Sequence, residues 1–129
     1  MSLTLRVLDG ELAIVRLPRG SAIPSWLPPS AAPLTSVTIT DQELSIICPS
    51  SVVPPYLDAH AGWIALRVED TLDFSAVGIL SSILSPLAAA GINILSISTF
   101  DTDYILVPAA KLEGALEALR PDFALLEVQ

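Results

Sequence analysis

The sequence has little cysteine, histidine and positive charge, and each scarcity excludes a class of function. Cys48 is the only cysteine among the 129 residues, so the chain cannot form an internal disulfide. With His60 as its only histidine, the sequence also lacks the ligands of a usual zinc site, and we expect no metal. Six basic residues against 14 acidic ones give a net charge of −8. Because phosphate backbones and anionic lipids are held by clustered basic side chains, we expect neither a nucleic-acid nor a membrane partner.

Long apolar runs are also missing, although 52% of the residues are hydrophobic. The longest candidate, residues 77–95, is interrupted by serines, Pro86, Gly91 and Asn93, and so falls short of the roughly 18 to 20 apolar residues that span a bilayer. The N-terminus lacks the pattern of a signal peptide. We therefore expect a cytoplasmic protein. So apolar a composition on a small chain further predicts that a second copy covers part of the surface, as in a homodimer.

The second half of the chain alternates strand-like and helix-like patterns. β-Branched and apolar residues predict strands, and apolar residues at helical spacing predict helices. The strands are expected at residues 62–69, 92–99, 104–107 and 123–128, and the helices at 75–90 and 111–119. Pro86 lies inside the first helix, where it can kink the helix or end it early. The order β-α-β-β-α-β predicts an α+β, ferredoxin-like fold, with a four-stranded antiparallel sheet and both helices on one face.

The first half reads as a weaker copy of the second. Residues 3–8 and 11–17 alternate on either side of Asp9-Gly10 and predict an N-terminal hairpin. Five prolines between positions 18 and 33 prevent a long helix, and residues 35–48 predict a second hairpin that aligns loosely with residues 95–107. We interpret the chain as two tandem repeats. Residues 1–61 would be a degenerate first repeat that has lost most of its helices, and residues 62–129 an intact second one.

The sequence contains none of the usual catalytic constellations. His60 is expected in a connector and Cys48 as a buried, unreactive thiol, and no nucleotide-binding or hydrolase motif is present. Two groups of carboxylates remain. They can form turns and cap helices, or they can contact a ligand, and the sequence leaves both roles open. They are Glu69, Asp70 and Asp73 after the first strand, and Asp101 and Asp103 in the later hairpin. Without a base or metal beside them they do not indicate an enzyme, and no cofactor is expected.

Gly78 lies near the start of the first predicted helix, where unpaired backbone N–H groups suit a carboxylate. A glycine at this point allows a ligand to approach the backbone closely. An equally simple interpretation is a glycine that packs against the sheet.

Two segments of the sequence resemble the ACT domain family, the small amino-acid-sensing module of many metabolic enzymes. The string Ile97-Ser-Thr-Phe-Asp-Thr-Asp-Tyr-Ile-Leu-Val107 is similar to stand-alone tandem ACT proteins, a group that includes the cytosolic arginine sensor of animals. The string Asp41-Gln-Glu-Leu-Ser-Ile-Ile-Cys-Pro49 resembles the first repeat of the same group. The resemblance implies a non-enzymatic regulator that binds a small molecule, in particular an amino acid.

The resemblance also implies a binding site at a loop glycine and at a Thr-Phe-x-x-Asp stretch. The matching positions are Gly78, Thr99, Phe100 and Asp103, and Asp73, Val77 and Ile79 flank them in sequence. The arginine sensor carries four repeats and this chain about two, so an equivalent pocket would need a dimer. The sensor has an acidic residue one turn into its first helix, whereas this chain has serines there, at positions 81 and 82. The alternatives are a module that only pairs subunits or partner proteins without a ligand, and an enzyme of ferredoxin-like fold.

Overall fold

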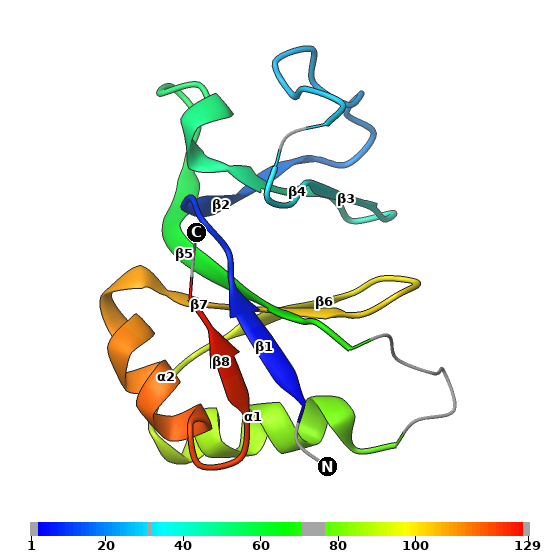
Figure 1. Cartoon of the computed structure of the whole chain (residues 1–129). Coiled ribbons are helices and arrows are strands. Elements are labelled where there is room, and N and C mark those ends of the chain that lie inside the picture. The colour runs from blue at the N-terminus through cyan, green and yellow to red at the C-terminus, as the bar shows by residue number, and fades with distance from the viewer. Residues whose placement is uncertain (1–2, 31, 71–76, 128–129) are drawn as a thin grey trace. The chain divides into compact units, whose positions relative to one another are not determined.

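The computed structural model describes residues 3–30, 32–70 and 77–127, which form two compact units (Figure 1). Unit 1 combines residues 1–9 with residues 64–129, and unit 2 consists of residues 10–63. The strand β5, Ala59–Val68, contributes its first half to unit 2 and its second half to unit 1. Each unit therefore holds its own part of one eight-stranded sheet and has its own core.

Unit 1 is a five-stranded sheet with two α-helices, in the strand order β6-β7-β5-β1-β8. Strand β1 runs antiparallel to β5 and parallel to β8, and β6 and β7 form an antiparallel hairpin. Besides β5, the elements are β1 (Thr4–Val7), α1 (Ile79–Ala89), β6 (Leu95–Ser98), β7 (Asp103–Pro108), a 3₁₀ turn (Ala109–Lys111), α2 (Leu112–Leu119) and β8 (Ala124–Leu126). The predicted β-α-β-β-α-β order is confirmed.

Two details of the prediction for this sheet are wrong. The sheet has a fifth strand, since β1 lies between the first and last strands of the β-α-β-β-α-β pattern. The N-terminal hairpin is not formed either, because β1 pairs with β5 and β8, whereas residues 12–18 pair with β4 and with the first half of β5. An alternating pattern indicates which side chains face the core, but it does not specify the partner strand.

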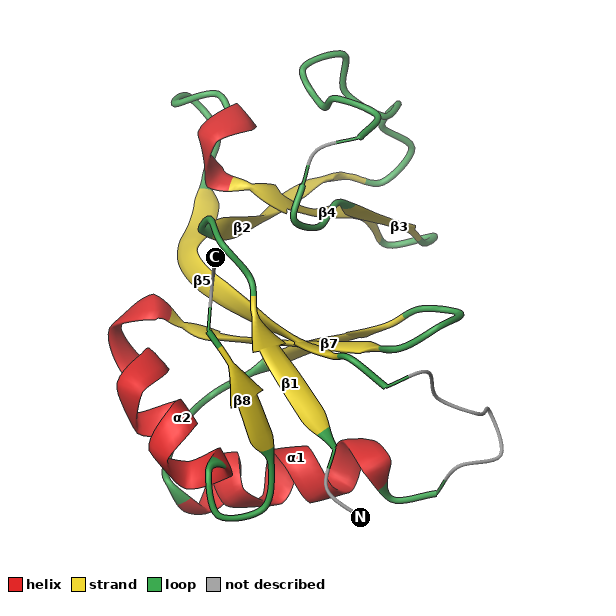
Figure 2. Ribbon diagram, viewed as in Figure 1, coloured by secondary structure: helices red, strands yellow, loops and turns green. Residues whose placement is uncertain are grey.

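Both helices cover the same face of the unit 1 sheet, as predicted (Figure 2). Alternate strand residues on this face, such as Leu66, Val68, Ile105 and Val107, share one core with buried residues of both helices. The helices contribute Ile83, Leu87, Ala115, Leu116 and Leu119. Helix α1 continues through Pro86 for one further turn, so the proline does not end it at that point. Burial of these apolar side chains is what holds the short helices on the sheet.

Unit 2 is a four-stranded antiparallel sheet in the order β3-β4-β2-β5, and it contains no α-helix within its described residues. Its further elements are β2 (Leu12–Pro18), β3 (Ser36–Ile39), β4 (Glu43–Pro49) and a 3₁₀ turn (Ser50–Val52). The predicted hairpin of residues 35–48 is confirmed, and the Thr40 hydroxyl accepts the N–H groups of Gln42 and Glu43 in its turn. A first repeat without helices is therefore what the structure shows.

One face of the unit 2 sheet is packed and apolar. Val15, Leu44, Ile46 and Cys48 are buried there. The proline-rich segments cover them with Trp26, Leu27, Val52, Val53 and Leu57. Loops thus replace helices as the cover of this sheet. In the described part of the whole chain, no helix is both long and apolar enough to cross a membrane.

Candidate functional site

Gly78 is the N-cap of α1 and has a left-handed backbone, with φ of 80°. Apart from its two chain neighbours, a Cβ at this position would meet no atom of the described residues within 4 Å, so Gly78 does not pack against the sheet. The packing interpretation is therefore wrong, and the glycine is required by the conformation of the turn into the helix. Val77 before it is 93% exposed and Ile79 after it is half-buried. Asp73 lies outside the described residues.

The β6–β7 hairpin closes in a short turn that Thr99 and Thr102 stabilise. The Thr99 N–H donates to the Thr102 carbonyl at 2.8 Å, and the Thr102 hydroxyl donates to the Val68 carbonyl at 2.6 Å, which fixes the turn to the end of β5. Phe100 at the tip is 81% exposed. Asp103 begins β7 and accepts a hydrogen bond of 2.5 Å from the Ser98 hydroxyl.

The topology brings the predicted residues to one end of the unit 1 sheet. Strand β7 starts where β5 ends, because the two strands are antiparallel neighbours, and α1 begins after β5 at that same end. The residues do not share one face, however. Asp103 alternates with Ile105 and Val107 and so belongs to the helix-covered face of the sheet. Thr99 belongs to the opposite face, together with Tyr104.

A cavity of about 220 Å³ lies at this end, on the face of the sheet away from the helices. Of the predicted site residues that the structure describes, Thr99 alone lines the cavity. The other lining residues are Arg67, Val68, Glu69, Asp70, Asp101, Thr102 and Tyr104. The carboxylates singled out in the sequence thus have two roles here. Asp70 accepts the Thr4 N–H at 2.9 Å, and Glu69 pairs with arginines.

The Glu69 carboxylate joins two arginines that the sequence did not single out. Arg6 and Arg67 are direct partners on β1 and β5, and their Nε atoms lie 2.6 and 2.7 Å from Glu69 Oε1 and Oε2. These hydrogen bonds, from Arg67 and then Arg6, hold the pKa of Glu69 below its ordinary value, and the bond to Glu69 raises the pKa of Arg67. Only the strand pairing brings residues 61 positions apart together, so no local sequence signal could have found this network.

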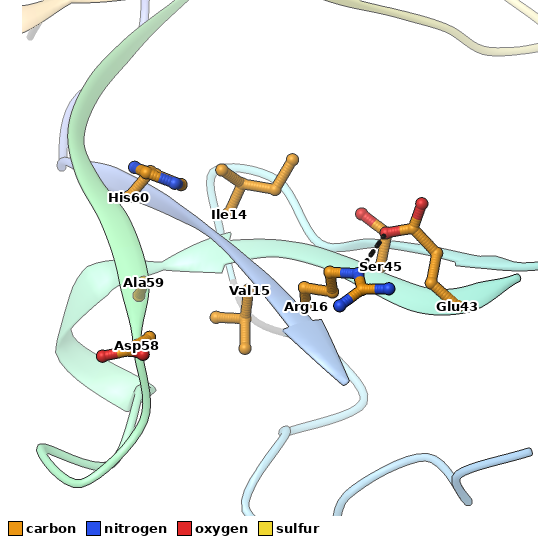
Figure 3. Close-up of a pocket in the computed structure, with 8 residues that line it drawn as sticks. All are labelled: Ile14, Val15, Arg16, Glu43, Ser45, Asp58, Ala59 and His60. Atoms are coloured by element: carbon orange, nitrogen blue, oxygen red, sulfur yellow. Dashed lines mark ion pairs between the residues drawn. The ribbon is translucent and has the colours of Figure 1, made fainter. Parts of the chain in front are cut away.

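Unit 2 has a larger cavity of about 640 Å³ that sequence analysis missed (Figure 3). Its charged and polar lining residues are Arg16, Glu43, Ser45, Asp58 and His60, and its apolar ones are Ile14, Val15 and Ala59. His60, expected in a connector, lies in β5 opposite Ile14. Cys48 is on the packed face, where burial raises the pKa of its thiol, as expected for an unreactive cysteine.

The two halves of the chain match two different family models. Residues 58–121 match the family model of the ACT domain, and residues 10–55 match a second family model, that of an N-terminal domain. The crystal structure of Atu0741 from Agobacterium tumefaciens is similar with 34% identity and a TM-score of 0.90, over 98% of this chain and 94% of that one. The chain therefore belongs to one family with that protein, and it contains an ACT domain.

More distant structures share the fold. The Vibrio cholerae protein VC0802 is 19% identical with a TM-score of 0.75, over 93% of this chain and 89% of that one. The regulatory subunit of aspartate kinase from Thermus thermophilus is 12% identical with a TM-score of 0.54, over 88% of this chain and 91% of that one. At these identities the likeness concerns the fold.

Proposed function

We propose that this protein is a non-enzymatic regulator that binds an amino acid, and that it acts in the cytoplasm as a homodimer. The observation that carries the proposal is the ACT domain at residues 58–121, together with a fold that the regulatory subunit of an aspartate kinase shares. A resemblance to the arginine sensor of animals in the hairpin string is consistent with an amino acid as the ligand. The division into repeats at residues 1–61 and 62–129 belongs to the same proposal.

The proposed site lies at the end of the unit 1 sheet where α1 begins, on the helix-covered face. We call this place, around Gly78 and Asp103, the rim of unit 1. The first turn of α1 starts after Gly78 with backbone N–H groups that suit a carboxylate, and the open backbone at Gly78 lets a ligand approach them. Asp103 belongs to the same end and the same face, and its carboxylate would take the ammonium group. Asp73, Val77, Ile79 and Phe100 would complete the site, whereas Thr99 would act from the opposite face by fixing the hairpin turn.

Exposed apolar side chains at this end support a dimer. Val77 and Phe100 are 93% and 81% exposed, and large apolar side chains gathered at one end of a small unit mark contact surfaces. A second copy that packs there would exclude water from the rim and strengthen its polar contacts with a ligand. The same side chains also favour the second candidate function, a pairing module without any ligand.

Calorimetry and thermal unfolding with each of the twenty amino acids test the proposal. At a ligand concentration of 100 Kd, binding stabilises the protein by about 2.7 kcal/mol, which is a visible shift. Asp103→Asn should weaken binding at least about tenfold, because an ammonium group loses its anionic partner. Asp122→Asn, at an exposed turn of the same unit, is the matched control and should bind like wild type.

Oligomeric state and amino-acid binding, measured together, separate the two candidates. Light scattering should show a dimer that Phe100→Ser weakens. A dimer that binds none of the twenty amino acids would establish the ligand-free module instead. A monomer that binds an amino acid would remove the dimer from the proposal and leave the ligand.

A further inference from the structure

The open face of the unit 2 sheet carries charged residues at positions that alternate with its core. Side chains alternate along β2 and β4. The residues next in sequence to those buried on the packed face therefore point to the opposite, open face. Arg16 on β2 pairs in register with Ser45 on β4, and Ile14 pairs with His60 on β5. The order β4-β2-β5 thus puts Arg16 on the middle strand, with Glu43 on one side and Asp58 on the other.

The charged side chains of this cavity form no strong ion pair with one another. Arg16 Nε lies 3.8 Å from Glu43 Oε1, and the two side chains are 74% and 40% exposed, so this ion pair contributes little. In the described part of the chain, no hydrogen bond or ion pair engages the side chain of Asp58 or of His60. Figure 3 shows the Arg16 side chain directed toward Glu43. Asp58 and His60 lie on the other side of β2, in the segment that leads into β5 and in β5 itself. This contrasts with Glu69 in unit 1, whose two arginines lie at 2.6 and 2.7 Å.

We infer that unit 2 holds a ligand site of its own for a small zwitterion, with Arg16 binding its carboxylate and Asp58 its ammonium group. The cavity offers a cation that makes only a long, exposed ion pair and a carboxylate without a partner among the described residues, and an α-amino acid carries the two complementary charges. The guanidinium of Arg16 can hold a carboxylate with two parallel hydrogen bonds. His60 and Ser45 supply further polar contacts.

The cavity has the size and the lining that such a ligand requires. Its volume of about 640 Å³ lies within the usual range of small-molecule sites, roughly 300 to 1,000 Å³. Ile14, which is half-buried and on the same face as Arg16, gives it an apolar side that can accept an aliphatic part of the ligand. Its charged residues are one cation and two carboxylates, so a ligand that carries only negative charge is disfavoured.

Calorimetric titration of the full chain with each standard amino acid tests this site. The strongest ligand is then compared with its N-acetyl and amide derivatives, each of which removes one of the two charges. Both derivatives should bind at least about tenfold more weakly, and so should the natural ligand to Arg16→Gln and to Asp58→Asn. Arg19→Gln, at an exposed arginine outside the cavity, should bind like wild type, and circular dichroism checks that each variant is folded.

This site and the rim of unit 1 respond to different substitutions. Binding that Arg16→Gln weakens and Asp103→Asn leaves intact supports the unit 2 site, even if the proposed rim site fails. Binding that only Asp103→Asn weakens overturns the unit 2 site while the proposed function stands. The inference is also overturned if no standard amino acid binds, or if the charge-deleted derivatives bind as well as the parent compound.

Discussion

Replacing Glu69 by glutamine should destabilise unit 1, since it removes the anion that joins Arg6 and Arg67. Glutamine keeps the size of the side chain but carries no charge, and it leaves two guanidinium groups facing each other across a register pair. Hydrogen bonds to charged groups contribute roughly 1.5 to 3 kcal/mol each, whereas exposed ion pairs contribute roughly 0 to 1. With Glu69 24% exposed and its arginines 30% and 34% exposed, solvent screens part of the interaction. We expect Glu69→Gln to cost about 2 kcal/mol in total.

The loss should depend on pH with a definite sign. The pKa of Glu69 is lower in the folded protein than in the unfolded chain, so its contribution is fully present above the unfolded pKa and disappears as the pH falls through the folded pKa. The difference between wild type and Glu69→Gln should therefore be largest at neutral pH. It should shrink in acid, once the carboxyl group is protonated and can no longer pair with the arginines.

Urea unfolding followed by circular dichroism at a helical wavelength measures this loss, because α1 and α2 both belong to unit 1. The matched control is Glu43→Gln, whose pair with Arg16 is long and exposed and whose removal should change the free energy of unfolding by less than about 0.5 kcal/mol. Equal losses for the two variants, or a Glu69→Gln loss that is the same in acid as at neutral pH, would refute the reasoning.

Three further predictions concern the backbone, the core and the thiol. Gly78→Ala should cost about 1 kcal/mol in urea unfolding because φ is 80°, whereas Gly114→Ala inside α2 should be stabilising or neutral, since its new methyl group would lie 3.8 Å from Ile92. Leu87→Ala should cost about 3 kcal/mol by the same measurement, because Leu87 is fully buried in the unit 1 core, whereas the exposed Leu126→Ala should cost under about 1. Cys48 should react slowly with a thiol reagent in the native protein and rapidly in denaturant, and equal rates would contradict its burial.

Local patterns were sufficient to predict the elements of unit 1. Apolar residues at helical spacing located α1 and α2, and runs of β-branched and apolar residues located β5, β6, β7 and β8, because both patterns follow from which side chains must be buried. The proline-rich stretch of the first half indicated that no long helix would form there, and the described residues of that stretch contain none. The resemblance to ACT domains rested on the hairpin string, and residues 58–121 do match that family.

Pairing across the chain was beyond the reach of these patterns. The strand at residues 4–7 was expected to pair with its neighbour in sequence, and it lies instead between β5 and β8. A short alternating strand satisfies its burial equally well beside several partners, so only the complete sheet decides among them. The Arg6–Glu69–Arg67 network depends on that pairing, and it was missed for the same reason.

The sequence by itself determined the order of elements and the loss of most helices from the first half. It also selected, through the resemblance, the candidate binding residues of the second half. Only the tertiary structure decided which side chains share a face. It separates Thr99 from Asp103, it shows that Gly78 serves the backbone and not packing, and it gathers Arg16, Asp58 and His60 around one cavity. Periodicity describes one strand at a time, whereas a site is made where several strands meet.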